Sequence, residues 1–208
     1  NRELGDLRTR LTGIALLRLE VLERVKDQIE AQLGRTNDAG QELVTIADNG
    51  NIVINEGLVF AYNSYEIKQE GRSLLNQLAS AFERVLDDPN TRNNIDAINI
   101  QGHTDSTGSP AYNRDLSTKR ATAVVTYMMD SNPNLEQKFG SYFAASGYSE
   151  FRPIATNQSA SGRALNRRIE IAIILKDDQV QNIIDDYLDE SMDIFSQSYQ
   201  NALAENLR

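Results

Sequence analysis

The residues with the clearest potential for chemistry in this 208-residue chain lie in the stretch 100–121. Asp105 falls in a polar turn with two glycines and a proline, and the sequence predicts a helix from about Asn113. Steps of four and three residues place Asn113, Ser117 and Arg120 on one stripe of that helix, at the mouth of the turn. Asp105 and Arg120 together could bind a ligand that carries an ammonium and a carboxylate side by side, because a carboxylate accepts from an ammonium and a guanidinium fork matches a carboxylate.

Taken one at a time, these residues also have ordinary structural interpretations. Asp105 is typical of a turn residue that caps its own backbone, and Asn113 is typical of a helix cap. Arg120 alone is compatible with a surface position on a helix. Their joint placement around one turn favours a binding site.

Other chemistries find less support in the sequence. His103 is the only histidine, which excludes a multi-histidine metal site, and we expect a strand-end imidazole hydrogen-bonded to nearby backbone. Cysteine is absent, which excludes a thiolate nucleophile and a cysteine metal site. The chain contains neither a Gly-x-Ser-x-Gly elbow nor a phosphate-binding loop, whereas a glycosidase using two carboxylates stays open. We expect no metal and no cofactor.

The composition is that of a globular domain and argues against a nucleic-acid partner. The hydrophobic fraction is 40% and the charged fraction 25%, and no run approaches the ~20 apolar residues that a membrane span needs. A net charge of −9 and a pI near 4.7 are opposite to what phosphate binding requires. The chain starts at Asn1 without a basic-then-apolar leader, so we expect a processed or trimmed chain whose upstream membrane anchor would not be visible.

Long amphipathic helices are expected at both ends of the chain. The first covers residues 2–34, ends at Gly34, and has two interpretations. The helix packs on its own domain, or positions 4, 7, 11, 14, 21 and 25 form the a/d seam of a parallel coiled coil, with a homodimer as the expected state. The second covers residues 177–208 and is acidic; we expect it to dock on the domain and to expose its Asp and Glu residues to solvent.

Between these ends, strands alternate with helices. A hairpin is predicted around Asp48-Asn49-Gly50, because Asn-Gly between β-branched runs favours a tight turn. The next predicted elements are a helix at 67–86, a strand at 95–101, a helix at 113–130, a polar connection at 131–140, a strand at 142–146, a loop at 152–165 and a strand holding Ile169, Ile171 and Ile173. On this last strand Arg168 shares the face of Glu170, whereas Arg167 points with the isoleucines or sits just before the strand. The order predicts an α/β two-layer sandwich, a mixed β-sheet with two helices on one face.

Two ordered blocks of sequence resemble one known family. The string GHTDSTGSPAYNRDLSTKRATAVVTYM resembles the signature of the OmpA/MotB C-terminal domain family, whose members bind peptidoglycan. The downstream run GYSEFRPIATNQSASGRALNRRIEI is similar to the second block of that family. The resemblance covers roughly residues 51–176, and two blocks in order are more specific than a single motif.

The resemblance implies a β-α-β-α-β domain that binds peptidoglycan, without catalysis, through the diaminopimelate of the stem peptide. It implies three segments, with a helix and linker at 1–40, an OmpA-like domain at 41–176 and the acidic helix at 177–208. Such a domain would be periplasmic or extracytoplasmic, and would meet a membrane only through a segment outside this chain. The binding residues carried over from the family are Thr104, Asp105, Asn113, Ser117, Arg120, Arg167 and Arg168.

Two alternatives of a different class stay open at this stage. A wall-lytic enzyme would use surface carboxylates, and a coiled-coil scaffold would bind protein partners through its globular part. The sequence does not distinguish a motor-stator protein from a lipoprotein or an outer-membrane protein.

Overall fold

The computed structural model of the protein describes residues 2–176. Its elements, in chain order, are α1 (Arg2–Leu33), β1 (Thr45–Ile46), β2 (Ile52–Asn55), α2 (Glu56–Val59), α3 (Gln69–Asp87), α4 (Pro89–Arg92), β3 (Ile95–His103), α5 (Pro110–Ser131), α6 (Pro133–Phe139), the 3-10 turn η1 (Gly140–Tyr142), β4 (Phe143–Gly147), α7 (Ala160–Asn166) and β5 (Arg168–Leu175).

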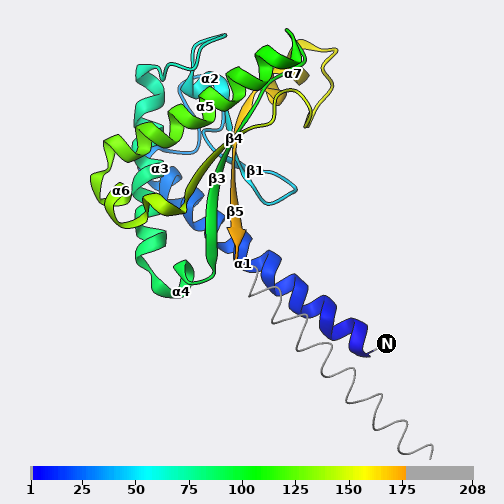
Figure 1. The fold of residues 1–208 in the computed structure, drawn as a ribbon, viewed down its shortest axis with the longest axis vertical. Helices are drawn as coiled ribbons and strands as arrows, with labels where there is room; N and C mark the ends of the chain where they lie inside the picture. Colours follow the sequence, from blue (N-terminus) through cyan, green and yellow to red (C-terminus); the bar gives the residue numbers. More distant parts are fainter. Residues whose placement is uncertain (1, 177–208) are drawn as a thin grey trace, which may run out of the picture. The chain divides into compact units, whose positions relative to one another are not determined.

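Residues Arg18–Ile174 form one compact unit, built on a five-stranded sheet with the strand order β1-β2-β5-β3-β4 (Figure 1). Strand β2 pairs antiparallel with both β1 and β5, whereas β3 and β4 are parallel. The sheet is therefore mixed, and the predicted α/β class is confirmed.

The hairpin predicted around the Asn-Gly turn is present. Ile46 lies opposite Ile52 in the ladder between β1 and β2. Gly50 has a φ of +76°, a conformation that glycine adopts without a Cβ penalty. The side chain of Asn49 accepts a hydrogen bond from the backbone N–H of Asn51 at 3.0 Å and so fixes the turn.

Helices α3 and α5 pack against each other, and α5 packs on β3 and β4 (Figure 1). The predicted apolar face of α3 is buried along its whole length, at Leu74, Leu75, Leu78, Ala81, Phe82, Val85 and Leu86. The polar stripe predicted for α5 is also buried, at Asn113, Ser117 and Arg120, and continues into the core at Val124. A stripe of polar groups inside the protein is unusual, and each of these side chains needs a partner there.

Two glycines allow α5 to approach the sheet closely. Gly102 on β3 and Gly147 on β4 are partners in the parallel ladder. A Cβ at Gly102 would lie 2.0 Å from the carbonyl oxygen of Ser117, and one at Gly147 would lie 2.5 Å from the backbone nitrogen of Thr118. Only glycine fits at these positions, so the carboxyl ends of the two strands are held against the second turn of α5.

Two segments predicted without regular structure contain helices. The polar connection 131–140 contains α6, where Asn132 accepts a hydrogen bond from Leu135 N–H at 3.1 Å and where Leu135 and Phe139 are buried. The loop predicted at 152–165 ends in α7, where Ser159 accepts from Gly162 N–H at 3.0 Å. In both segments the N-terminal cap favours a short helix that the polar composition conceals.

The part of α1 inside the compact unit buries Val21, Leu22, Val25 and Ile29 in the protein's own core. Two of these, Val21 and Val25, are also positions of the predicted coiled-coil seam. This half of the helix therefore packs on its own domain, and a coiled coil formed by the first half stays a prediction. The acidic helix predicted from residue 177 lies outside the described residues.

Within residues 2–176, no helix combines the length and the apolar character needed to cross a lipid bilayer.

Candidate functional site

Three chain segments meet where β2 and β3 end and β5 begins. In the ladder between β2 and β5, Asn55 lies opposite Arg168. One residue further, Glu56 lies beside Arg167, and its N–H donates to the Arg167 carbonyl at 3.2 Å. Beyond the end of β3, Thr104 N–H donates to the Ser149 carbonyl at 3.0 Å. The sheet thus places Glu56, Thr104 and Arg167 at one end, close to the inward-facing stripe of α5.

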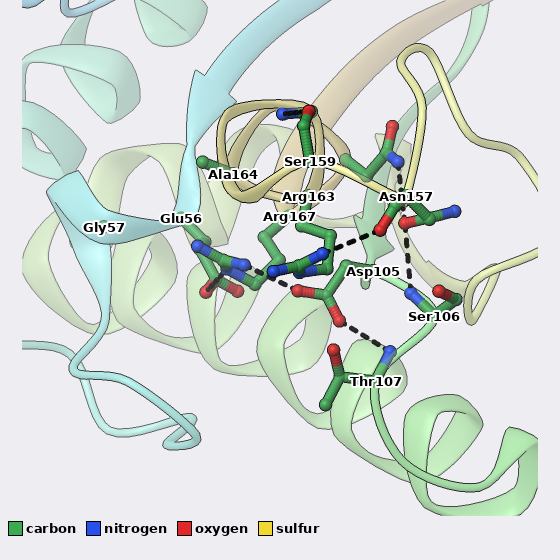
Figure 2. A network of polar contacts seen from close by, with 12 residues as sticks. Glu56, Gly57, Asp105, Ser106, Thr107, Asn157, Ser159, Arg163, Ala164 and Arg167 are labelled. Carbon is green, nitrogen blue, oxygen red and sulfur yellow. Dashed lines mark hydrogen bonds and ion pairs between the residues drawn. The ribbon is translucent and has the colours of Figure 1, made fainter.

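The turn that follows β3 is held from two sides. Asp105 Oδ1 accepts from Thr107 N–H at 2.8 Å, and Ser106 N–H donates to Asn157 Oδ1 at 3.2 Å (Figure 2). The same Asn157 oxygen accepts from Asn166 Nδ2 at 2.9 Å. The expected turn-capping role of Asp105 is therefore present, and it uses one carboxylate oxygen only.

Four charged side chains form an alternating series, Arg120, Glu56, Arg167 and Asp105, which we call the pocket cluster. Arg167 lies between the two carboxylates, with Nη1 at 2.5 Å from Asp105 Oδ2 and Nε at 2.8 Å from Glu56 Oε1 (Figure 2). The other oxygen of Glu56, Oε2, pairs with Nη1 of Arg120. Arg120 Nε donates in addition to the Ser64 carbonyl at 2.8 Å.

These groups are buried, and burial shapes their ionisation. Arg120 is 1% exposed; burial lowers its pKa although Glu56 opposes the effect, and the guanidinium stays charged. Burial also raises the pKa of Glu56 even though both arginines act against it. For Asp105, burial is outweighed by the hydrogen bonds from Arg167 and Thr107, which lower its pKa. Asp105 is thus a stable anion, whereas the buried place of Glu56 disfavours its charged form.

A cavity of about 30 Å³ opens at the pocket cluster, enough for about two water molecules. Its lining residues are Glu56, Tyr62, Asn63, Thr104, Asp105, Thr107, Asn113, Leu116, Arg120 and Arg167. Asn113 Nδ2 donates to the Asp105 carbonyl at 3.2 Å and also to the Glu150 carboxylate. The Thr104 hydroxyl is buried without a hydrogen-bond partner among the described residues. Five predicted binding residues, Thr104, Asp105, Asn113, Arg120 and Arg167, therefore line one cavity.

The other two predicted residues lie elsewhere. Ser117 is fully buried, donates to the Arg114 carbonyl at 3.0 Å and accepts from Ser149 N–H at 3.1 Å, so it ties α5 to the turn after β4. Arg168 does not line this cavity, and its Nε lies 2.7 Å from Glu170 Oε1. It also donates to the carbonyls of Asn166 and Arg152, each at 3.0 Å.

Arg168, Glu170 and His103 form a second group, which we call the closed cluster. Glu170 accepts from Asn51 Nδ2 at 2.8 Å; against the effect of burial, this bond and the charge of Arg168 lower the Glu170 pKa. His103 stacks on Tyr148, with ring centroids 5.3 Å apart. Neither ring nitrogen of His103 has a hydrogen-bond partner among the described residues, so the expected bond to backbone is absent.

The closed cluster keeps His103 neutral. Burial lowers the pKa of His103 to about 4, and the neighbouring positive charge of Arg168 contributes to the shift. The nearest carboxylate, that of Glu170, has Oε1 at 4.0 Å from His103 Nε2 and only partly offsets these effects. No group of three or more His, Cys, Asp or Glu side chains in residues 2–176 is arranged to hold a metal ion.

Glu56 is the residue of the pocket cluster that the sequence did not single out. It belongs to neither motif block and follows an alternating strand, where an acidic residue is ordinarily exposed. The available signal was local: Glu56 is the only charged residue in the run 52–62, between strand residues and the apolar stretch that follows. A charge in such a run is a candidate for a buried partner.

The comparisons with known proteins agree on one family. The model of the OmpA family matches residues 59–167, a little over half of the chain. Outer membrane protein A of Bordetella avium is 35% identical over 123 residues, which are 59% of this chain and 57% of that protein. Motility protein B of Bacillus subtilis is 31% identical over 162 residues, which are 74% of this chain and 57% of that protein. The chain spans little more than half the length of these two relatives.

A solved structure is similar over a larger share of its own chain. The cell wall anchor of the T6SS from Pseudomonas aeruginosa matches with a TM-score of 0.53 and 28% sequence identity. The match covers 76% of this chain and 99% of that one. The likeness therefore extends over nearly the whole of the solved domain.

Proposed function

The chain belongs to the OmpA family, and on that premise we propose that its domain binds peptidoglycan without catalysing a reaction. The ligand is the free end of diaminopimelate in the stem peptide, where an ammonium and a carboxylate lie side by side. The observation that carries the proposal is that Asp105 and Arg120, an anion and a cation, line the same cavity. Asp105 accepts from the ammonium, and the Arg120 guanidinium binds the carboxylate.

The setting of the domain supports this ligand. In this proposal the domain is extracytoplasmic, since relatives are described as an outer membrane protein and an outer-membrane lipoprotein. One structural relative is described as a cell wall anchor. In this proposal the domain tethers a membrane-anchored protein, of motor-stator or lipoprotein type, to the wall, and the first half of α1 pairs with a second copy to form a homodimer.

Two further groups of the cavity suit the same ligand. The Thr104 hydroxyl is buried and has no partner among the described residues, so it can bond to the ligand without breaking a bond. Asn113 holds the Asp105 carbonyl and so fixes the turn that presents the carboxylate. Recognition therefore rests on local, directional contacts, which a chain of net charge −9 needs when the wall polymer is also acidic.

The arrangement of the carboxylates argues for binding and against wall lysis. A glycosidase places the scissile bond between its two carboxyl groups. Here Arg167 occupies the space between Glu56 and Asp105 and forms an ion pair with each. In a turbidity assay on purified wall, we expect the protein to sediment with the wall without clearing the suspension; clearing would favour the lytic alternative.

The binding test is calorimetric titration of stem peptide into the parent and into Asp105→Asn. Asparagine retains an oxygen that accepts from Thr107 N–H, so the variant removes the charge and keeps the turn. We expect Asp105→Asn to bind about tenfold more weakly or worse, because a charge-assisted hydrogen bond contributes about 1.5–3 kcal/mol. The parent should prefer a peptide with free diaminopimelate over one whose side-chain carboxylate is amidated. Equal affinity of the parent for the two peptides would refute the proposed ligand.

A further inference from the structure

The proposed binding group for the ligand's carboxylate is already occupied. Arg120 Nη1 pairs with Oε2 of Glu56, a side chain that is 7% exposed and whose two oxygens are each held by a different arginine. Asp105 is likewise occupied, with Oδ2 at 2.5 Å from Arg167 Nη1. Both proposed contacts to the ligand therefore have an internal counterpart: Glu56 supplies a carboxylate to Arg120, and Arg167 supplies a cation to Asp105.

The volume of the cavity also indicates that a lining side chain must move before the ligand can enter. About 30 Å³ holds about two water molecules, far less than a carbon bearing an ammonium and a carboxylate. Arg120 cannot withdraw to make room, because its helix is held to the sheet at Gly102 and its side chain is fully enclosed. The Arg167 side chain is 25% exposed, so the side of the cavity formed by Glu56 and Arg167 is the one that can shift.

We propose that Glu56 is an internal competitor for the ligand, whose carboxylate holds the place on Arg120 that the ligand's carboxylate takes when it binds. This inference rests on the proposed function. On binding, Glu56 releases Arg120 and stays paired with Arg167, with which it forms a second ion pair in the closed state. Release leaves neither charge unpaired, because Glu56 keeps its ion pair with Arg167 and Arg120 gains the carboxylate of the ligand.

The exchange keeps every charge paired only for one class of ligand. In the closed state the series Arg120, Glu56, Arg167 and Asp105 is neutral as a whole. After exchange, Arg120 pairs with the ligand's carboxylate, Asp105 with its ammonium, and Glu56 with Arg167. A ligand with the carboxylate alone would take Arg120 from Glu56 and bring no ammonium to Asp105, so that Arg167 would be the single cation of the cluster for both carboxylates. Glu56 therefore makes the site select a zwitterion over a simple carboxylate.

The test is calorimetric titration of the parent and Glu56→Gln with two peptides, a stem peptide with a free diaminopimelate end and the same peptide with that amine acetylated. Glutamine retains the size of the side chain and removes its charge, so Arg120 has no internal anion to exchange. We expect Glu56→Gln to bind the free peptide about fivefold more tightly than the parent. The affinity of Glu56→Gln for the acetylated peptide should increase by a larger factor. The ratio of the two affinities, free over acetylated, should therefore be smaller in Glu56→Gln than in the parent.

Two further variants serve as controls. Glu42→Gln removes a carboxylate that pairs with Arg35 at 2.7 Å on the exposed surface, outside the cavity lining, and should leave both affinities unchanged. Glu56→Asp keeps the charge but is one methylene too short to hold both arginines at once, and should bind between the parent and Glu56→Gln. If Glu56→Gln does not fold, the affinity of Glu56→Asp for the free peptide tests the competitor role of Glu56.

The outcomes separate this inference from the function on which it rests. If the parent binds neither peptide, the proposed function fails. If the parent binds the free peptide and folded Glu56→Gln binds it equally or more weakly, the competitor role is overturned and Glu56 is a positioning residue for Arg120. The same pattern in Glu56→Asp would overturn it as well.

Discussion

Arg167 and Arg168 are neighbours in the chain, yet they belong to clusters of opposite character. Arg167 joins the pocket cluster beside a cavity and is 25% exposed. Arg168 joins the closed cluster, is 2% exposed and has its hydrogen bonds within the protein. Both clusters contain buried ion pairs and shifted pKa values, so these features alone do not identify a binding site. The difference is that all four charged side chains of the pocket cluster line one cavity, whereas the side chains of the closed cluster do not line it and Arg168 lines a different pocket.

The alternation of side chains along a strand explains the separation. Arg168 and Glu170 are two residues apart on β5 and so lie on one face, as their ion pair of 2.6 Å requires. Arg167 is the C-cap of α7, immediately before the strand. Its side chain lines the cavity together with that of Arg120 on α5. One step along the chain therefore changes an arginine's surroundings completely.

The largest expected effect is on stability, from removing one arginine of the neighbouring pair. Arg168→Ala leaves the buried Glu170 without its cation and should lower the free energy of unfolding by about 3–5 kcal/mol. Arg167→Ala removes a partly exposed group, while Glu56 keeps its pair with Arg120 and Asp105 its hydrogen bond from Thr107, and we expect a loss of about 1 kcal/mol. Urea denaturation of the parent and both variants measures the difference. Equal losses would mean that the two clusters do not differ as their geometry indicates.

The next effect is on the pH dependence of the closed cluster. The unfolded chain protonates His103 near pH 6.5, whereas the folded protein does so near pH 4, because burial and Arg168 lower its pKa. Between these values the unfolded state binds more protons, so stability falls as pH falls. The contribution over the whole interval is about 3 kcal/mol.

Replacement of His103 by phenylalanine isolates this contribution. His103→Phe retains an aromatic ring to stack on Tyr148 and has no proton to bind. Stability measured from pH 6.5 to pH 4 should fall less steeply in the variant than in the parent, with the carboxylates as a background common to both. Parallel curves would show that His103 is protonated equally easily in the folded and unfolded states.

The fold could be predicted from the sequence to the extent that its signals are local. Periodicity located α3, α5 and the alternating part of β5, and the Asn-Gly turn located the hairpin. The helices α6 and α7 could not be found in this way, because their exposed faces are polar and only the caps at Asn132 and Ser159 mark them. The predicted boundary was wrong where a strand runs into a polar segment: β3 ends at His103, two residues beyond the prediction.

The candidate site was only partly predictable, for a similar reason. Asp105 and Arg120 are close in sequence, so a turn and one helix stripe sufficed to bring them together. Glu56 reaches them through the pairing of Asn55 with Arg168, a contact between segments more than a hundred residues apart that local pattern does not encode. The choice between Arg167 and Arg168 depends on where β5 begins, and at that residue the parity rule is ambiguous.

A smaller effect is expected on the affinity for stem peptide, which should change when an arginine of the pocket cluster is replaced by lysine but not when one of the closed cluster is. Arg120→Lys retains the charge facing Glu56 and loses the planar fork, so stem-peptide binding should weaken about tenfold. Arg168→Lys loses a fork in the closed cluster, and should reduce stability without changing affinity once the protein is folded. Calorimetric titration of both variants, with melting temperatures alongside, gives the comparison. An affinity loss in Arg168→Lys equal to that in Arg120→Lys would place the closed cluster in the binding site.

The smallest expected effect concerns two buried polar side chains, Thr104 in the lining of the cavity and His103 in the closed cluster. The Thr104 hydroxyl and both His103 ring nitrogens are buried without hydrogen-bond partners among the described residues, but only Thr104 lines the cavity. Thr104→Val keeps the shape of the side chain and removes a hydroxyl that is unsatisfied in the free protein, so stability should stay equal or rise by up to about 1 kcal/mol. Stem-peptide affinity should fall about threefold to fivefold, since the ligand loses one neutral hydrogen bond. His103→Phe is the matched control and should leave affinity unchanged. If Thr104→Val destabilises the protein, the hydroxyl has a partner in the free state; if affinity is unchanged while stability rises, Thr104 shapes the cavity without bonding to the ligand.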